Sequence, residues 1–225
     1  MKIKLVIFDL DGTLVDTIAD LGMATNVALE AAGLPLRAPE EFRGMVGHGV
    51  RNLVKKAMPE PLQEDEALLE RLLTHFLAYY TEHIDDRSHP YPGIPELLSE
   101  LSAAGVQLAV ASNKFQAGAE KLLGRMFPGI RFAAILGGRP GAPLKPDPAI
   151  VDEIRSRVGV SREQTVLVGD SATDMATAAN AGVEGIAVSW GFRPKEALRA
   201  ASRIADTASQ LRAMLMEESS EGGIA

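Results

Sequence analysis

Near the start of the chain, four apolar residues, Leu5–Phe8, lead directly into two carboxylates, Asp9 and Asp11. A short continuous apolar run of this kind is typical of a strand buried on both faces of a parallel sheet. The two carboxylates therefore come where the strand ends, and ligands bind at this end of the strands in open α/β sheets. Because neighbouring carboxylates repel each other and are costly to desolvate, the pair predicts a divalent cation here.

Residues 16–88 carry a helical pattern instead. Apolar residues recur at helical spacing over 21–32, over the shorter segments 40–45 and 50–58, and over the long segment 64–83. We find no convincing strand pattern in this region, and residues 85–93 are polar and rich in proline, as expected of a linker that returns to the sheet. The pattern predicts an all-helical insertion after the first strand.

Helix and strand patterns alternate in the rest of the chain. Strands are predicted over residues 106–111, 132–136, 165–168, 185–188 and 203–205. Helices are predicted over residues 94–104, 115–126, 148–158, 172–181, 194–200 and 208–216, and the polar tail 217–225 is expected to fray. Such alternation predicts an α/β fold with a doubly wound parallel sheet. We expect a catalytic core of residues 1–15 and 89–225, with a helical cap of residues 16–88 above the strand ends.

Composition narrows the classes of function. Of the 225 residues, 46% are hydrophobic, which is enough for a sizeable core, and the absence of cysteine excludes disulfides, thiolate catalysis and cysteine-based zinc sites. A formal net charge of -7 gives no support for a nucleic-acid or membrane partner, although a few local cations can still bind an anionic substrate. With neither a signal-peptide pattern nor an apolar run of membrane-spanning length, the expected location is the cytoplasm.

Four polar clusters lie at the predicted strand ends or open the next helix. They are Asp9-Leu10-Asp11-Gly12-Thr13, Ala111-Ser112-Asn113-Lys114, Lys145-Pro146-Asp147-Pro148 and Gly169-Asp170-Ser171-Ala172-Thr173-Asp174. Each cluster alone has an ordinary structural explanation, such as a helix cap or a turn. Because all four fall at the same edge of one predicted sheet, we interpret them together as one site.

The residue types in these clusters suit phosphoryl transfer. Asp9, Asp170 and a backbone carbonyl provide the oxygen ligands that Mg2+ prefers. The Ser112 hydroxyl and the Lys145 ammonium are donors for a phosphoryl group. One carboxylate can attack phosphorus as a nucleophile, and a second carboxylate two residues further on can move the protons.

The same clusters resemble, in order, the four motifs of the haloacid dehalogenase-like hydrolases. The residues that carry the resemblance are 9–17, Ala111-Ser112-Asn113, Lys145-Pro146 and Gly169-Asp170 with Asp174. The resemblance covers essentially the whole chain and implies a Rossmann-like core with a helical cap inserted just after the first motif.

The resemblance also implies roles for the acidic residues and for Lys145. Asp9 is expected to be the nucleophile and a Mg2+ ligand, and Asp11 the general acid and base, with its backbone carbonyl as a further ligand. Asp170 is expected to bind Mg2+, and Asp174 to orient the metal shell and Lys145. Catalysis is thus assigned to Asp9, Asp11 and Lys145.

Binding of the transferring phosphoryl group is assigned, by the same resemblance, to Ser112, Asn113 and Lys145, together with Gly12 and Thr13. The presence of Asp11 argues against dehalogenation, because the dehalogenases of this superfamily lack the second aspartate. Thr13 favours a phosphatase, because the phosphomutases typically carry valine there.

Substrate specificity is expected to come from the cap, where Gly47-His48-Gly49-Val50-Arg51 forms a glycine-containing loop. Glycines let the backbone approach a ligand, and His48 and Arg51 could bind a carboxylate. The loop is similar to the substrate loop in the caps of phosphoglycolate phosphatases. The expected reaction is hydrolysis of a small phosphorylated metabolite, first of all 2-phosphoglycolate, by a monomer or homodimer.

Three alternatives stay open at this point. Other members of the family with this cap type cleave pyrophosphate or act on sugar phosphates, as in a phosphomutase similar to beta-phosphoglucomutase. A receiver-like module that only accepts a phosphoryl group is the more distant alternative, because it needs neither the second acidic cluster nor a helical insertion. The loop Trp190-Gly191-Phe192-Arg193 is expected to face the same edge of the sheet, without an assigned role.

Overall fold

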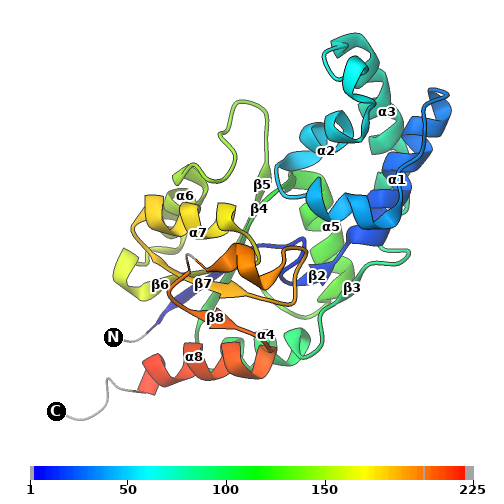
Figure 1. Ribbon diagram of the computed structural model, residues 1–225. Helices are drawn as coiled ribbons and strands as arrows, with labels where there is room; N and C mark the ends of the chain where they lie inside the picture. Colours follow the sequence, from blue (N-terminus) through cyan, green and yellow to red (C-terminus); the bar gives the residue numbers. More distant parts are fainter. Residues whose placement is uncertain (1–2, 200, 221–225) are drawn as a thin grey trace.

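A six-stranded parallel sheet forms the centre of the molecule in the computed structural model, which describes residues 3–199 and 201–220 (Figure 1). Across the sheet the strands are β5 (Ala134–Gly138), β4 (Gln107–Phe115), β1 (Leu5–Phe8), β6 (Thr165–Gly169), β7 (Glu184–Val188) and β8 (Ile204–Ala205). All neighbouring pairs in this order are parallel. The predicted α/β fold with a Rossmann-like, doubly wound sheet is confirmed.

The alternation of side chains along β1 divides the interior into two hydrophobic cores. Leu5 and Ile7 point to one face, where they pack with residues of α6 (Ala149–Val158) and α7 (Ala172–Ala181). Val6 and Phe8 point to the other face and join a second core. That second core includes residues of α4 (Ile94–Ala103), α5 (Gln116–Met126) and α8 (Ala208–Ser220). Because successive side chains of a strand face opposite sides, an unbroken apolar run requires helices on both faces (Figure 1).

A helical segment lies beyond one end of the sheet (Figure 1). It consists of α1 (Ile18–Ala31), η1 (Pro39–Gly44), α2 (Gly49–Ala57), η2 (Glu60–Leu62) and α3 (Glu66–Glu82). The apolar stripe of α3, which includes Leu72, Phe76 and Tyr80, is buried. The Asp65 carboxylate caps α3 by accepting a bond of 2.9 Å from the backbone N–H of Leu68. An all-helical insertion after β1 is therefore present.

The chain enters and leaves this helical segment through two short paired strands. In these, β2 (Val15–Asp16) and β3 (His89–Pro90) pair in antiparallel fashion. Next to them, the buried Asp20 carboxylate accepts bonds from the backbone N–H groups of Arg87 and Ser88. The two chain segments that connect the helical segment to the sheet are therefore hydrogen-bonded to each other. The division of the chain into a catalytic core of residues 1–15 and 89–225 and a cap of residues 16–88 stays a prediction.

Several element boundaries differ from those predicted. Strand β4 does not end at residue 111 but continues through Ser112 and Asn113 to Phe115, with a shift in register between Ala111 and Phe115. Asn113 and Lys114 can continue this buried strand because partners on other segments satisfy their side chains, as described below. The segments 40–45 and 194–200 form 3-10 turns, at Pro39–Gly44 and Lys195–Leu198, and residue 200 lies outside the described residues.

The tail was also mispredicted in part. Helix α8 continues to Ser220, so residues 217–220 extend the helix, whereas 221–225 lie outside the described residues.

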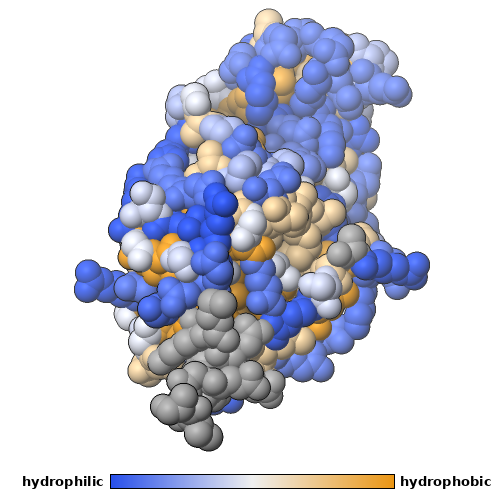
Figure 2. Space-filling view, turned by 90° about the vertical axis from the view of Figure 1, so that its left-hand side faces the viewer, coloured by the Kyte–Doolittle hydropathy of each residue, from blue (hydrophilic) through white to orange (hydrophobic). Residues whose placement is uncertain are grey.

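Figure 2 shows one face of the molecule, which is mostly hydrophilic, with apolar residues in small groups between polar ones. None of the helices among the described residues is both long enough and apolar enough to cross a bilayer.

Candidate active site

Three neighbouring strands bring the acidic and hydroxyl side chains together. Strand β1 lies between β4 and β6, so three adjacent strands supply Asp9 and Asp170, which directly follow β1 and β6, and Ser112, which lies in the second half of β4. The backbone N–H of Asp9 continues the sheet by donating to the Val168 carbonyl at 2.8 Å. Because all three strands are parallel, their carboxyl ends meet at one edge of the sheet. The clusters expected to share one edge do so.

A buried lysine links two of the carboxylates. The Lys145 side chain is only 2% exposed, and its ammonium lies 2.9 Å from Asp9 Oδ1 and 2.6 Å from Asp174 Oδ1. It also donates to the Ala111 carbonyl at 2.9 Å. Burial alone would lower the pKa of Lys145, but the carboxylates of Asp174 and Asp9 outweigh burial and raise it. Lys145 therefore stays charged between the two acids.

Burial and mutual repulsion act on the acids themselves. Burial raises the pKa of Asp9 to about 6, against the opposing charge of Lys145 and with a further contribution from Asp174. Burial, with repulsion from Asp174 and Asp9, raises the pKa of Asp170 to about 8. Carboxylate oxygens of all three residues lie within 4.8 Å of one another. Such a set of hard oxygen donors, short of positive charge, fits a Mg2+ ion.

The three carboxylates differ in how many of their oxygens already have hydrogen-bond partners in the protein. Both oxygens of Asp174 have protein partners, because Oδ1 pairs with Lys145 and Oδ2 accepts from the Ser171 hydroxyl at 2.5 Å. Asp9 Oδ1 accepts from the Leu10 N–H at 2.7 Å as well as from Lys145. Asp170 Oδ2 accepts from the Phe192 N–H at 2.8 Å. The bonding of Asp174 suits a residue that orients Lys145 and the metal shell, and leaves Asp9 and Asp170 as the candidate side-chain ligands.

These raised pKa values predict that the metal-free protein loses stability as pH rises. Asp9 and Asp170 have folded pKa values of about 6 and about 8, above their ordinary 3.8, so the folded state binds more protons than the unfolded state between these values. Their contribution to the free energy of unfolding is fully present below the unfolded pKa and is lost as pH rises through the folded pKa. Thermal denaturation in the presence of a chelator, between about pH 5 and pH 8.5, measures this decline.

Addition of Mg2+ is expected to raise the melting temperature more at the upper end of this range, because the metal must displace protons from the acids at the lower end. Asp170→Asn serves as the matched variant, since it removes the carboxylate with the larger shift and should flatten the decline. An equal effect of Mg2+ at all pH values would contradict the assignment of these acids as ligands.

Asp11 lies beside this cluster, and its side chain is bonded elsewhere. Its carboxylate accepts from the Thr17 hydroxyl at 2.9 Å and from the Lys114 ammonium at 3.1 Å and 3.3 Å. The Asp11 side chain is not one of the three clustered carboxylates found among the described residues. Its expected contribution to the metal, through the backbone carbonyl, stays a prediction. Asp11 is one of the described residues that line the pocket.

Gly12 and Thr13 support Asp170. Gly12 has a φ of +89°, and a Cβ atom there would lie 2.5 Å from Asp170 Oδ2, so only glycine fits. The fully buried Thr13 places its hydroxyl 3.5 Å from Asp170 Oδ1. The lack of a side chain at Gly12 and the hydroxyl of Thr13 thus help to place a candidate metal ligand. Neither residue is among the described residues that line the pocket.

Asn113 uses its whole amide group to join three segments. Its Oδ1 accepts from the Lys145 N–H at 2.8 Å, while its Nδ2 donates to the carbonyls of Lys145 at 3.2 Å and of Gly47 at 2.9 Å. An amide nitrogen has two hydrogens, and both are used here. In this arrangement Asn113 holds the loop before α2 against the sheet, and phosphate binding by its side chain would require breaking one of these bonds.

The two residues expected to bind substrate from the helical segment lie away from the acids. The Arg51 side chain is 50% exposed and pairs with Glu70 at 2.5 Å and with Glu66. His48 is exposed between Gly47 and Gly49. Among the described residues, those lining the pocket include both glycines but neither His48 nor Arg51. A contact between Arg51 and substrate would require it to leave both glutamates.

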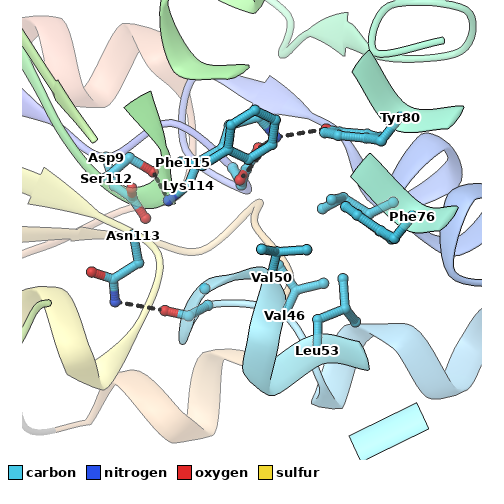
Figure 3. Close-up of a pocket in the computed structure, with 14 residues that line it drawn as sticks. Asp9, Val46, Val50, Leu53, Phe76, Tyr80, Ser112, Asn113, Lys114 and Phe115 are labelled. Carbon is cyan, nitrogen blue, oxygen red and sulfur yellow. Dashed lines mark hydrogen bonds and ion pairs between the residues drawn. The ribbon is translucent and has the colours of Figure 1, made fainter. Parts of the chain in front are cut away.

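The pocket itself lies between the sheet edge and the helical segment (Figure 3). Its sheet side carries Asp9, Asp11, Ser112, Asn113, Lys114 and Phe115. Its helical side carries Leu21, Val46, Gly47, Gly49, Val50, Leu53, Phe76 and Tyr80. The pocket is thus polar where the sheet ends and mainly apolar where the helices cover it.

Comparison with known proteins decides the family. A family model described as haloacid dehalogenase-like hydrolase matches residues 6–188. The chain belongs to this family. It is 38% identical over 193 residues to a phosphoglycolate phosphatase of Mesorhizobium japonicum, with 85% of each chain covered. It is 39% identical to a phosphoglycolate phosphatase of Pseudomonas syringae pv. tomato, over 84% of this chain and 70% of the relative.

Solved structures agree with this haloacid dehalogenase-like assignment. A proposed phosphoglycolate phosphatase from Lactobacillus delbrueckii subsp. bulgaricus has a TM-score of 0.89 and 36% identity, covering 96% of this chain and 99% of the other. CbbY from Rhodobacter sphaeroides, solved with phosphate, has a TM-score of 0.75 and 27% identity, covering 93% and 96%. The predicted family and the predicted class of enzyme, a phosphoric monoester hydrolase, are confirmed.

Some residues of this hydrolase site were missed in the sequence. The sequence pattern assigns no role to Lys114, although it lies in the polar cluster with Ser112 and Asn113, and it places Tyr80 only within the helix predicted over residues 64–83. The loop 190–193 does face the site, as expected, and its contacts are specific. Phe192 binds Asp170 through its N–H, and the Trp190 indole N–H donates to the Thr13 carbonyl at 3.1 Å. The position of this loop just after a strand was the available signal.

Gly191 in this loop yields a prediction about metal binding by the hydrolase. A Cβ atom at Gly191 would overlap the Asp170 side chain and the Gly12 carbonyl oxygen. Gly191→Ala is therefore expected to displace Asp170 and to weaken Mg2+ binding by about 10- to 100-fold, the usual effect of disturbing a residue that supports a metal ligand. Titration of Mg2+ by calorimetry or by activity measures the change. Gly124→Ala is the matched control, because nothing lies within 4 Å of a Cβ atom there. Unchanged Mg2+ affinity in Gly191→Ala would show that Asp170 is not a ligand.

Proposed function

We propose that the protein is a Mg2+-dependent phosphatase that hydrolyses a small phosphomonoester through an aspartyl-phosphate on Asp9. The first candidate substrate is 2-phosphoglycolate. The observation that carries the proposal is the arrangement around Asp9. Its carboxylate lies beside Lys145 and the acid cluster and also borders a pocket that contains Asp11 and Ser112. Such a carboxylate can reach a phosphoryl group while cations neutralise the charge of that group.

Asp9 and Asp170 would hold Mg2+, with the Asp11 carbonyl as a further ligand and Asp174 as the orienting group. When bound, the ion would neutralise charge on Asp9 and on the phosphoryl oxygens. Lys145 would bind a phosphoryl oxygen in exchange for one of its three present bonds, to Asp9, to Asp174 and to the Ala111 carbonyl. Its bonds to Asp9 and Asp174 keep it in place and charged.

Ser112 would donate its hydroxyl proton to a second phosphoryl oxygen. The Ser112 side chain is buried in the second half of β4, and its Oγ accepts from the Lys114 N–H at 3.2 Å, which leaves the O–H to donate. Positioning of the phosphoryl group by these fixed donors would supply much of the rate enhancement.

The reaction would then take two steps. In the first, Asp9 attacks phosphorus and the ester P–O bond breaks, while protonated Asp11 gives its proton to the leaving alkoxide. In the second, Asp11 takes a proton from water, and the hydroxide attacks the phosphorus of the aspartyl-phosphate. Inorganic phosphate leaves, and the free Asp9 carboxylate is restored.

The pocket is small in this conformation. Its cavity of about 40 Å3 has room for about three water-sized groups, which is less than a whole phosphomonoester needs, so substrate entry would require the helical segment to shift, and to shift further for a larger leaving group. The names of the relatives at 38% and 39% identity point to phosphoglycolate. Cytoplasmic location and a monomeric or homodimeric state stay predictions.

A screen of phosphate esters tests the proposal. The purified protein, with Mg2+, is incubated with 2-phosphoglycolate, sugar 1-phosphates, pyrophosphate and p-nitrophenyl phosphate, and inorganic phosphate is measured. We expect the highest kcat/KM with 2-phosphoglycolate. An isomeric sugar phosphate as product would indicate a phosphomutase, preference for pyrophosphate a pyrophosphatase, and stable phosphorylation without turnover a phospho-acceptor module. Each of these results would overturn the proposal.

A further inference from the structure

A second buried lysine, Lys114, has no part in the reaction steps above. Its side chain is only 2% exposed, and its ammonium donates to the two oxygens of Asp11 at 3.1 Å and 3.3 Å. It also donates to the Tyr80 hydroxyl at 2.6 Å and lies 4.7 Å from the centre of the Tyr80 ring. Figure 3 shows the tyrosine reaching across from the helical side of the pocket to this group.

The three residues of this cluster come from three separate parts of the chain. Asp11 follows β1, Lys114 belongs to β4, and Tyr80 lies in the last turn of α3 in the helical segment. The cluster is therefore a direct polar connection between the helical segment and the carboxylate that is proposed to move protons.

The charges in the cluster make this connection a strong one. A buried ammonium is costly unless it is paired and hydrogen-bonded. Burial would lower the pKa of Lys114, but Asp11 and Tyr80 outweigh it and raise that pKa, so the ammonium persists. Burial raises the pKa of Tyr80 to about 12, so the phenol stays neutral and accepts the bond from Lys114. Loss of Tyr80 would leave one ammonium proton without a partner in a buried site.

A second anchor limits how Asp11 can turn. Its Oδ1 also accepts from the Thr17 hydroxyl at 2.9 Å, and Thr17 stands between β2 and α1, where the chain enters the helical segment. The carboxylate is thus held from both sides, by Lys114 on the sheet and by Thr17 at the entry of the helices. With Thr17 alone, rotation of the carboxylate about its Cβ–Cγ bond would be less restricted.

We propose that Lys114 and Tyr80 are positioning residues that hold Asp11 in line with the leaving oxygen, and that Tyr80 makes this alignment depend on the seating of α3 over the pocket. The proposal rests on the proposed function, in which Asp11 protonates the leaving alcohol. It also narrows the substrate class. A phosphatase in which two buried residues position the proton donor is suited to esters of aliphatic alcohols, whose alkoxides leave poorly without a proton.

Leaving-group dependence separates this role from simple packing. An aliphatic ester such as 2-phosphoglycolate needs protonation of its leaving oxygen, whereas p-nitrophenolate leaves readily without a proton. Misplacing Asp11 should therefore slow the aliphatic ester much more than the aryl ester. Weakened packing or weakened binding of the phosphoryl group would slow both esters alike.

The experiment compares kcat and KM of wild type, Tyr80→Phe and Lys114→Met on 2-phosphoglycolate and on p-nitrophenyl phosphate with Mg2+. Tyr80→Phe keeps the ring in the core and removes only the hydroxyl, so it is the primary variant if Lys114→Met folds poorly. We expect kcat for the aliphatic ester to fall about 10- to 100-fold, the range expected when a reacting group is misplaced or proton transfer is impaired, and kcat for the aryl ester to fall far less.

Tyr79→Phe is the matched control. Tyr79 precedes Tyr80 on the same helix and stacks on His83 at 4.2 Å, and its substitution should leave both rates near those of wild type. An equal fall on both esters in Tyr80→Phe, or no fall on either, would overturn the positioning role while leaving the phosphatase intact. Wild-type protein that releases phosphate from neither ester would overturn the proposed function and this inference together.

Discussion

Replacement of Asp9 by asparagine is expected to abolish turnover while the protein stays folded. The proposed reaction forms a bond between the Asp9 carboxylate and phosphorus, and an amide is a far weaker nucleophile. Loss of a nucleophile that works within a catalytic group typically costs about 10^4-fold or more in kcat. Phosphate release from 2-phosphoglycolate and from p-nitrophenyl phosphate, each at saturating Mg2+, measures the loss.

The fold should tolerate this change because the asparagine oxygen can accept the same two bonds. Asp9 Oδ1 takes bonds of 2.7 Å from the Leu10 N–H and 2.9 Å from Lys145. Since burial and neighbouring charge raise the pKa of Asp9 to about 6, its ionised form destabilises the metal-free protein near neutral pH. We therefore expect the melting temperature of Asp9→Asn without Mg2+ to equal or exceed that of wild type at pH 8.

The matched control makes the same chemical change outside the acid cluster. Asp147 is exposed, and its carboxylate accepts from the Ala149 N–H at 2.9 Å at the start of α6, a task that asparagine performs equally well. Asp147→Asn should keep full activity. Substantial turnover by Asp9→Asn, within about 100-fold of wild type, would show that another group carries the attack.

Replacement of Lys145 by methionine is expected to affect both stability and activity. The ammonium is 2% exposed and lies 2.9 Å from Asp9 and 2.6 Å from Asp174, so its removal leaves buried carboxylates without their cation. Breaking a buried ion pair by removing one partner costs about 3–5 kcal/mol of the free energy of unfolding. Phosphate release should be lost as well, because Lys145 is a proposed donor to the phosphoryl group.

Chemical denaturation with and without Mg2+ measures the first effect. Mg2+ should restore part of the lost stability, because it supplies positive charge to the same acids. Lys195→Met is the matched control, since that lysine is 54% exposed and pairs with Asp206 at 2.6 Å on the surface, where such pairs contribute about 0–1 kcal/mol. If Lys145→Met proved as stable and active as Lys195→Met, the assigned role of Lys145 in the site would have to be abandoned.

The bonds between the sheet edge and the helical segment have a consequence for how the pocket opens. Asn113 holds the Gly47 carbonyl, and the Arg193 guanidinium donates to the carbonyls of Arg43 and Val46. Together with the contact between Lys114 and Tyr80, these bonds connect the two sides of the pocket at separate points. Because the cavity is smaller than a whole phosphomonoester, admitting any substrate would break some of these bonds, and a small substrate would require the smallest opening.

Much of the fold was predictable because it depends on local pattern. Strand β1 and helix α7 begin and end where predicted, since an unbroken apolar run and a capping serine are signals within a few residues of the chain. The candidate acids were also predictable. Parallel strands bring their carboxyl ends to one edge, so the polar residues that follow Phe8 and Gly169 had to converge there.

Other features depend on contacts between segments far apart in the chain, and the spacing of apolar and polar residues does not indicate such contacts. Strand β4 continues through Asn113 and Lys114 because partners on other segments satisfy these polar side chains. Arg51, expected to face substrate, turns to glutamates of α3, which are nearby only once the helices pack. Gly191 carries no local signal of its role beneath Asp170.

The first motif illustrates both sides of this division. The sequence by itself determined that Asp9 and Asp11 stand at the end of a buried strand, because hydrophobicity and spacing are properties of the chain. Only the tertiary structure decided how they differ. Asp9 lies among carboxylates and Lys145, whereas Asp11 is held by Lys114 and Thr17 beneath Tyr80. Those partners come from other strands and from the inserted helices, and they contact Asp9 and Asp11 only once the helices have packed over the sheet.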